Sequence, residues 1–489
     1  MKTVWFQEMH PYPVQKVEAK LSSDRTMAKT MLERLVRSNI VRRVRNKRDS
    51  ELLLEETSKL ISGDEKYVVF KFVGIVLVGD VVVRCYPKYI YDVSQIKGKF
   101  KKILAVICKY NYKEQHIWLA DPCNIEHNAN ISMLSIVMAI IQQYYNNGIY
   151  FNLKRSREIN GSGEVDWDAT IENTRPVIQN NCPFYPEMYT KVTRYNTTDF
   201  FSRLHKSILA ECFSILSKAE LADMFKIQEN FFYDEKLESL GSKEYVLYRL
   251  QQEMRMQFVT QKRIILRLLY MYISQKGAGG TSENISFFGT GTFNLLWEKV
   301  CSTVFDSCLN IPVCSLNKLH LELRKKYPYG QKTLLELIER PTWKINTINE
   351  PFDSDTLKPD MIGLNGSIND VQFTIYDAKY YNFQVENHRI LGQPGIESIT
   401  KQYLYHVAYQ KFLQYFGIKK IKNIFLFPSD GEDDVSLGMV RFSMLANITK
   451  CDIDAVKLSA DKMYDCYLNN RMKILPISGP LFGIDKEIR

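Results

Sequence analysis

The sequence predicts an α/β multidomain protein with a mixed α+β N-terminal region, a helical middle and a C-terminal α/β core. Its 489 residues are too many for one ordinary domain. Runs of β-branched residues occur in its first and last thirds, whereas a helical period dominates the middle. The Gly-rich stretch 277–284 is the best linker in the chain. These observations predict domains at 1–195, 196–284 and 285–489.

Composition and charge narrow the class of protein. With 45% hydrophobic and 25% charged residues, the chain is neither disordered nor collagen-like. The formal net charge is +10, and residues 1–48 contain 12 Lys and Arg against only 4 Asp and Glu. Most of the positive charge therefore lies in the first tenth of the chain. Such an excess permits a polyanionic partner without requiring one.

The compartment follows from what the chain lacks. Its first residues have no apolar signal-peptide core, and its most apolar stretch, 68–83, is broken by Lys71 and Asp80. The ten cysteines form no CxxC pair, so no zinc spacing is present. We therefore expect a cytoplasmic protein that has reduced thiols and does not associate with a membrane.

The N-terminal half alternates between helical and strand patterns. A short helix is expected over 25–37, and Gly79-Asp80 between two β-branched runs predicts a tight turn between strands. Residues 99–111 and 131–147 are apolar enough to form buried helices. Strands are expected to return over 149–178.

The second half continues with helices and then with an α/β pattern. The helical period over 198–276 places Leu204, Ile208, Cys212 and Leu216 on one face. Beyond the linker, a helix around Glu298 precedes two apolar runs joined near Asn365-Gly366, a strong turn dipeptide. A helix over 396–416 and a buried strand over 421–427 follow.

The two runs around Asn365-Gly366 contain the most informative polar residues. Alternation along the second run places Asp377 and Lys379 on one face of a strand, about 7 Å apart by strand rise. Asp360 begins the neighbouring strand, so pairing can bring its carboxylate close to Asp377. Because apolar residues share the face of Asp377, the charges are expected to be partly buried, and a buried charge must be paired or bind a metal.

Two carboxylates and a lysine in this arrangement suit phosphodiester cleavage. Asp360 and Asp377 offer the hard oxygen ligands that Mg²⁺, or Mn²⁺, prefers. The metal would lower the pKa of a bound water, and Lys379 would orient that water or stabilise charge on the phosphate. The carbonyl of Ala378 is a further candidate ligand, and Glu298 could complete the acidic cluster.

Pro359-Asp360 with Asp377-Ala378-Lys379 resembles the PD-(D/E)-x-K nuclease signature. Glu298 and Gln402 lie where such nucleases often have a helical Glu and a Gln. The resemblance implies a restriction-endonuclease-like α/β core, with Asp360, Asp377, Lys379, Glu298 and Gln402 as catalytic residues. The carboxylates Asp360, Asp377 and Glu298 would hold the metal. One departure affects Gln402: the related pattern Q-x-x-x-Y ends here in His406.

Two N-terminal segments extend the resemblance. FKFVGIVLVGDVVVRCYPKYI (70–90) and NGSGEVDWDATI (160–171) look like the McrC-like subunit of McrBC-type restriction systems, with LlaJI-type restriction endonucleases most similar. The resemblance covers most of residues 65–470. It implies a partner, an McrB-like AAA+ GTPase. Because this chain has no Gly-Lys-Ser/Thr loop, GTP is expected on that partner.

The basic N-terminal segment has two interpretations. Dense positive charge attracts DNA phosphates, and it equally suits an acidic partner surface. The residues concerned are Arg42, Arg43, Arg45, Lys47 and Arg48.

We therefore predict a Mg²⁺-dependent endonuclease subunit that cuts double-stranded DNA in a GTP-dependent, modification-sensitive or sequence-specific restriction system used in antiviral defence. Two alternatives stay open. One is a non-catalytic adaptor with a nuclease-like fold that binds nucleic acid or stimulates the motor. The other is a stand-alone repair or recombination nuclease.

Overall fold

The structure is a computed structural model, and contacts among its Cα atoms divide the chain into two compact units. The smaller unit contains residues 1–2, 77–82 and 111–288, and the larger unit contains the rest. The larger unit is therefore assembled from segments that lie far apart in the sequence. The structure describes residues 2–44, 66–120, 133–196, 198–218, 233–276, 285–344, 352–386, 389–445 and 451–473.

A five-stranded sheet forms the centre of the larger unit, in the order β15-β16-β19-β21-β20. Its strands are β15 (Met361–Ser367), β16 (Asp370–Ala378), β19 (Lys420–Ser429), β20 (Val435–Val440) and β21 (Ile453–Ser459). β15 and β16 pair antiparallel, β16, β19 and β21 run parallel, and β20 is an antiparallel edge strand. The start of β15 and the carboxyl ends of β16 and β19 consequently meet at one edge.

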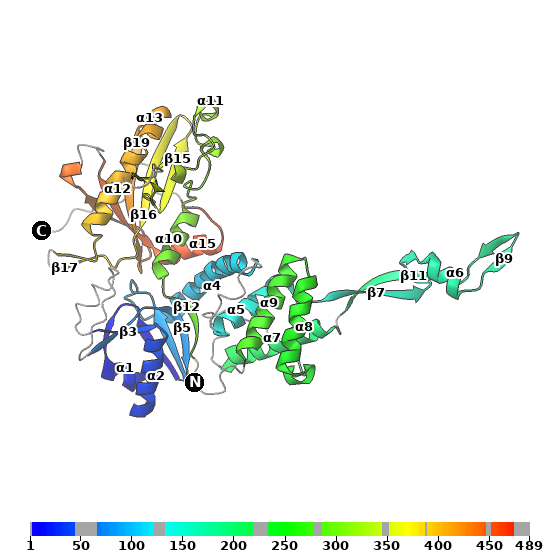
Figure 1. The fold of residues 1–489 in the computed structure, drawn as a ribbon. Helices are drawn as coiled ribbons and strands as arrows, with labels where there is room; N and C mark the ends of the chain where they lie inside the picture. Colours follow the sequence, from blue (N-terminus) through cyan, green and yellow to red (C-terminus); the bar gives the residue numbers. More distant parts are fainter. Residues whose placement is uncertain are drawn as a thin grey trace. The chain divides into compact units, whose positions relative to one another are not determined.

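Helices cover both faces of this sheet (Figure 1). They are α10 (Phe293–Val304), α12 (Ile396–Ala408), α13 (Gln410–Tyr415) and α15 (Ala460–Leu468). On one face, the ring of Phe373 packs against Tyr409 and Phe412, which belong to the segment of α12 and α13. On the other face, Phe305 at the end of α10 stacks on Tyr376. The C-terminal α/β core that the sequence predicts is confirmed.

The described part of the first 120 residues, most of which belongs to the larger unit, forms a mixed α+β region, as predicted. Its elements are β1 (Lys2–Gln7), β2 (Pro11–Pro13), α1 (Val14–Leu21), α2 (Arg25–Arg37), β3 (Val41–Val44), β4 (Tyr67–Phe70), β5 (Val73–Val78), β6 (Val81–Tyr86) and α4 (Ile96–Ala120). The Asp24 side chain accepts a hydrogen bond from the Thr26 N–H and so caps the helix expected at 25–37. Between β5 and β6, Gly79 has φ +56°, which confirms the predicted turn.

These N-terminal strands form two sheets, β2-β4-β3 and β1-β6-β5-β12, where β12 is Ser286–Thr290. Short elements surround the C-terminal core. They are η2 (Val313–Ser315), α11 (Leu321–Lys326), η3 (Leu335–Leu337), β13 (Thr342–Trp343), β14 (Phe352–Asp353), β17 (Gln384–Glu386) and β18 (Arg389–Leu391).

Helices dominate the smaller unit, as the period over 198–276 predicts. They are α5 (Met133–Asn147), α7 (Phe200–Lys218), η1 (Leu237–Leu240), α8 (Lys243–Met256) and α9 (Thr260–Gln275). The predicted stripe of α7 is buried, and α5, α7, α8 and α9 pack together. Gly148 follows α5 with φ +72°, the left-handed conformation expected of a C-terminal cap.

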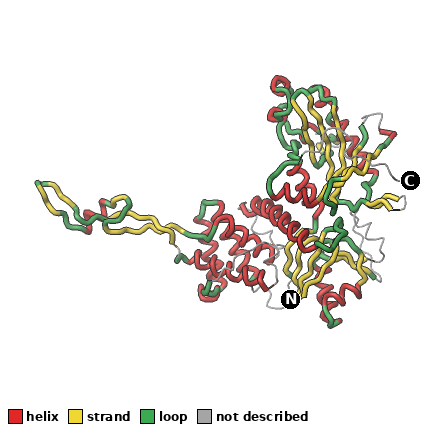
Figure 2. The backbone as a smooth tube through the Cα atoms, turned by 180° about the vertical axis from the view of Figure 1, so that it is seen from behind, coloured by secondary structure: helices red, strands yellow, loops and turns green. Residues whose placement is uncertain are grey.

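A long two-stranded ribbon projects from these helices (Figure 2). We call it the arm, residues 152–196. β7 (Asn152–Ile159) and β11 (Tyr189–Asn196) pair antiparallel over eight residues, from Asn152↔Asn196 to Ile159↔Tyr189. Farther along the arm are β8 (Glu164–Val165), α6 (Trp167–Asn173), β9 (Val177–Gln179) and β10 (Cys182–Phe184).

Three local expectations differ from the structure. Within the predicted strand region 149–178, residues 167–173 form a helix because Asp166 caps it by accepting from the Ala169 N–H. Asn365-Gly366 lies inside β15, and the chain reverses at 368–369. Gly366 is required there because its φ is +93° and a Cβ atom would lie 2.3 Å from the Asp370 carbonyl. The helix expected over 396–416 is divided into α12 and α13.

Some sequence predictions concern residues that the structure leaves undescribed. The linker at 277–284 lies outside the described residues. The partition into 1–195, 196–284 and 285–489 stays a prediction, since the two units follow a different division of the chain. Among the described helices, none combines the length and apolar character that crossing a membrane requires.

Candidate active site

Asp360, Asp377 and Lys379 meet at the sheet edge where β15 begins and β16 ends. The register pairs Met361 with Tyr376, so Asp360 stands beside Asp377. The Asp360 Oδ2 accepts a hydrogen bond from the Ala378 N–H at 2.9 Å, which ties the start of one strand to the end of the other. Asp377 is only 4% exposed. Strand pairing thus brings together the three residues that the sequence predicts to act together.

The electrostatics of Asp360 are those of a crowded acidic site. Burial raises its pKa to about 9, and the neighbouring charges of Asp377 and Glu298 and a hydrogen bond with Asp377 add to the effect. The hydrogen bond from Ala378 acts in the opposite direction. The proximity of Asp377 and Glu298 therefore disfavours the charged form of Asp360.

Lys379 supplies the positive charge of this corner. Its Nζ lies 2.9 Å from the Asp377 Oδ1. Burial alone would lower the pKa of Lys379, but the charges of Asp377 and Asp360 raise it above its usual value. The ammonium therefore occupies one of the several acceptor positions of the Asp377 carboxylate. Asp377 retains capacity to accept a further ligand.

Glu298 approaches the corner from α10. Its neighbour Trp297 is fully buried, and the Trp297 Nε1 donates to the Leu426 carbonyl of β19 at 3.3 Å. This contact anchors the helix on the sheet, and Glu298 itself is half-buried. Burial and then the charge of Asp377 raise the pKa of Glu298, whereas Lys379 opposes the shift. Three carboxyl groups and one ammonium therefore influence one another here.

Helix α12 packs on the face of the sheet opposite to α10 and contains two buried polar residues. Gln402 is 0% exposed, and neither its Oε1 nor its Nε2 has a hydrogen-bond partner in the described chain. A buried amide without partners costs roughly 1–3 kcal/mol, so its retention points to a ligand. His406, one turn later, is also buried, and burial lowers its pKa.

Tyr405 is a residue of the site that sequence reasoning missed. Its hydroxyl donates to the Lys358 carbonyl at 2.9 Å, just before Asp360. Burial raises the pKa of Tyr405, and the charges of Asp377 and Asp360 raise it further. The sequence did contain a signal for Tyr405. Gln402 and Tyr405 are three residues apart on one helix, so both lie on the same side of it.

The donor set fits a hard divalent cation. Carboxylates from Asp360, Asp377 and Glu298 are the oxygen ligands that Mg²⁺ and Mn²⁺ prefer. The fit is incomplete, however: in the described residues, no three His, Cys, Asp or Glu side chains are grouped closely enough to hold a metal ion. Lys379 already occupies one side of Asp377.

The basic N-terminal residues are only partly described. Arg42 and Arg43 lie half-buried on β3, opposite Val69 and Val68 of β4. Arg45, Lys47 and Arg48 lie outside the described residues. The choice between a DNA-binding and a partner-binding role stays a prediction.

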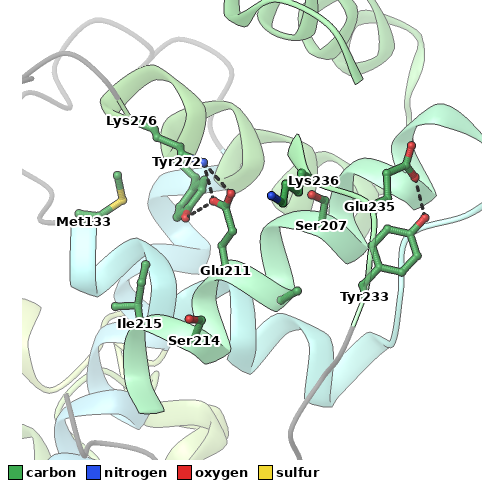
Figure 3. A pocket seen from close by; sticks show the side chains of 11 residues that line it. Met133, Ser207, Glu211, Ser214, Ile215, Tyr233, Glu235, Lys236, Tyr272 and Lys276 are labelled. Atoms are coloured by element: carbon green, nitrogen blue, oxygen red, sulfur yellow. Dashed lines mark hydrogen bonds and ion pairs between the residues drawn. The ribbon is translucent and has the colours of Figure 1, made fainter. Parts of the chain in front are cut away.

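A cavity of about 520 Å³ lies in the smaller unit, between α7, α9 and the segment before η1 (Figure 3). Glu211 and Lys276 form an ion pair at its wall, with Nζ and Oε1 2.6 Å apart, and the Tyr272 hydroxyl donates to the same carboxylate. None of the residues that the sequence predicts for catalysis lines this cavity. The candidate active site is therefore a sheet edge in the larger unit rather than this cavity.

Comparison with known proteins connects the chain to restriction enzymes. A model of the family described as LlaJI restriction endonuclease matches residues 72–322 and 325–461. Component YdjA of the type II restriction enzyme BsuMI from Bacillus subtilis (strain 168) is 28% identical over 433 residues. That alignment covers 84% of this chain and 82% of the relative.

Two solved assemblies from Thermococcus gammatolerans show weaker likeness. A half-complex from a tetradecameric assembly of McrB AAA+ hexamers with bound McrC has a TM-score of 0.39 and 14% identity, and covers 96% of this chain and 100% of that chain. A cryo-EM structure of the McrBC complex has a TM-score of 0.25 and 11% identity, and covers 61% and 85%. Likeness at this level leaves the partner of this chain open.

Proposed function

Because the chain belongs to the LlaJI restriction endonuclease family, we propose that it is the subunit of a restriction system that cuts double-stranded DNA. The observation that carries the proposal is the meeting of Asp360, Asp377 and Lys379 at one sheet edge, with Glu298 facing them. A buried acidic group with one lysine is costly for stability, and perturbed carboxyl groups of this kind concentrate at functional sites.

The cofactor of the proposed reaction is Mg²⁺ or Mn²⁺, held by Asp360 and Asp377 with Glu298 and the Ala378 carbonyl as further ligands. When bound, a divalent cation activates water and offsets charge on phosphate. Because the raised pKa of Asp360 favours its protonated form, cation binding at this carboxyl group would release a proton.

The other residues of the site bind and orient the phosphate and the attacking water. The Lys379 ammonium donates towards the phosphate oxygens or the attacking water, since its Nζ is already directed to the metal-binding carboxylate. Gln402 offers an unpaired amide donor and acceptor for the same purpose. Tyr405 holds the segment before Asp360 through its bond to the Lys358 carbonyl and acts as a positioning residue.

A partner supplies the nucleotide chemistry in this proposal. GTP binds to an McrB-like AAA+ GTPase, and this chain docks on that partner in the cytoplasm. We propose that the arm is the element that docks on this partner, because many apolar side chains are exposed on its narrow ribbon. These are Leu153, Ile159, Trp167, Ile171, Val177, Ile178 and Phe184.

The decisive experiment is cleavage of plasmid DNA by the full-length chain with Mg²⁺ or Mn²⁺, GTP and an McrB-like AAA+ GTPase as the partner. Lys379→Ala and Asp377→Ala should each lower the cleavage rate by roughly 10²–10³-fold, because charge on the phosphate loses its stabilisation. Both variants should still stimulate the GTPase of the partner, which controls for folding. Cleavage at the wild-type rate would refute the site assignment.

A non-catalytic adaptor is the second candidate. It is favoured by the lack, among described residues, of three side chains grouped to hold a metal. Calorimetric titration of Mn²⁺ into the wild-type chain and the Asp360→Ala variant separates the two. A nuclease binds the ion in a manner that depends on Asp360, whereas an adaptor shows no such dependence.

A further inference from the structure

The residue that follows Lys379 is anchored by the N-terminal end of the chain. Tyr380 is buried, and its hydroxyl donates a hydrogen bond to the Glu8 Oε2, which comes from a residue 372 positions earlier. Both residues belong to the larger unit. The ring of Tyr380 also packs against Phe293, the first residue of the helix that contains Glu298, with centroids 5.1 Å apart.

Glu8 is 6% exposed, and two donors satisfy the same oxygen. They are the Tyr380 hydroxyl and the Lys88 backbone N–H, which lies 3.3 Å away. Burial raises the pKa of Glu8, and the charge of Lys88 and these hydrogen bonds oppose the shift. A carboxyl group survives at this depth only because it is paired.

Lys88 completes the arrangement. It is 9% exposed, and its Nζ stands 4.5 Å from the centroid of the Tyr380 ring, within the range of a cation–π contact. Tyr89, the next residue, meets the same ring edge to face. The ring is therefore held by an ammonium, two aromatic side chains and the hydrogen bond of its own hydroxyl.

Such a group is poorly explained by stability alone. Burying a carboxyl, an ammonium and a phenol costs desolvation, and apolar residues of similar volume are often as stable or more stable. What directional contacts provide is a defined position. Here they define the position of Tyr380, the residue after Lys379. The backbone N–H of Lys379 in turn donates to the Leu426 carbonyl at 2.9 Å.

We propose that Glu8, Lys88 and Tyr380, here called the Glu8 clamp, are positioning residues that hold Lys379 and the Ala378 carbonyl in place for cleavage. The inference rests on the proposed nuclease function and goes beyond it, because two of the three residues lie outside the C-terminal core. The segment that follows the catalytic strand is thus fixed by Glu8, directly after the first strand of the chain, and by Lys88, in the segment after β6.

The test compares two disrupting and two control variants of the full-length chain. Tyr380→Phe removes one hydroxyl and keeps the ring, and Glu8→Ala removes the acceptor. Glu8→Gln retains an acceptor oxygen and should restore function. Tyr464→Phe is a matched control, because it also removes a buried hydroxyl, one that lies 2.7 Å from the Tyr89 hydroxyl.

Two readouts separate positioning from general damage. Tyr380→Phe and Glu8→Ala should lower the kcat of DNA cleavage by about 10-fold or more with KM unchanged, since small misplacements of catalytic groups have effects of this size. Mn²⁺ affinity measured by calorimetry should fall several-fold, because Ala378 and Asp377 lie only two and three residues before Tyr380. Glu8→Gln and Tyr464→Phe should match the wild type in both.

The outcomes of this test distinguish failure of the Glu8 clamp from failure of the proposed nuclease function. If the wild-type chain cleaves, Lys379→Ala does not, and Tyr380→Phe cleaves and binds Mn²⁺ as the wild type does, the clamp is refuted while the nuclease stands. Equal losses in Tyr464→Phe also refute it, since they assign the effect to stability. A wild-type chain that leaves DNA uncut with its partner present overturns both.

Discussion

Asp360 shows how a single position can favour chemistry over stability. It shares a buried corner with Asp377 and Glu298, and Lys379 offsets part of the charge of these carboxyl groups. Its role was predictable from spacing, because strand parity and pairing are local rules. Tyr405 was missed because the sequence comparison extended to His406 and ignored the residue one position earlier.

Replacing Asp360 with Asn should stabilise the protein when divalent cations are removed. The amide keeps an acceptor for the Ala378 N–H and removes an acid from a crowded site. We expect a gain of roughly 1 kcal/mol, about 2–4 °C in Tm, by analogy with other strained active sites. Melting in EDTA measures it.

The matched control is Asp370→Asn, on the same hairpin. Asp370 pairs with Lys420 at an exposed position and should change Tm little. Equal shifts in the two variants would contradict the repulsion argument.

His205 offers a test in the smaller unit. Its Nδ1 accepts from the Tyr150 N–H at 3.0 Å, and burial lowers its pKa to about 3. The unfolded chain takes up a proton near pH 6.5 while the folded chain does not, so stability is constant above that pH and falls below it. Between pH 7 and pH 5 the wild type should lose about 2 kcal/mol from this group.

Chemical denaturation at both pH values of the wild type and His205→Asn measures this loss. The Asn side chain can accept from Tyr150 but does not titrate, so its stability should depend less on pH. A variant as sensitive as the wild type would exclude His205 as the source.

At the scale of elements, periodicity located helices and strands better than it located their ends and turns. Helix α2 begins and ends where its apolar period and capping Asp24 predict. The wrong predictions have local causes. Asp166 caps helix α6 where a strand was expected, and Gly366 lies inside β15 rather than in the turn. A turn dipeptide and a strand glycine look alike in sequence because both reflect a positive φ.

The arm should be removable without loss of the helices that carry it. Asn152 and Asn196 are paired at its base, so an Asn-Gly turn can replace residues 154–194. We expect the helical part to melt as before and Mn²⁺ binding to persist, whereas stimulation of the partner GTPase should vanish. A GTPase assay measures the last effect, and unchanged stimulation would remove the arm from the docking proposal.

At the scale of the molecule, the contacts between segments far apart in the sequence could not be predicted. The C-terminal core was predictable as a series of elements, but its contacts with residues 3–110 were not, since no local pattern encodes them. Lys102 pairs with Asp461 and Asp465 of α15, and Lys109 donates to the Tyr467 carbonyl. The larger unit is therefore more than the nuclease segment predicted from residue 285.

A fragment of residues 285–489 should consequently fail to form a stable core by itself. It lacks Glu8 and Tyr89, and it leaves the hydroxyls of Tyr380 and Tyr464 buried or exposed without partners. Circular dichroism with thermal melting should show a weak or non-cooperative transition. A fragment that melts cooperatively at the temperature of the full chain would refute this expectation.

The interrupted path of the larger unit also has a consequence for synthesis on the ribosome. Its N-terminal segments emerge first, and its sheet edge with Asp377 emerges only after the whole smaller unit. At about 5–20 residues per second, the delay between residue 110 and residue 380 is on the order of tens of seconds. A nascent chain therefore displays its arm to a partner well before the centre that we propose cuts DNA can assemble.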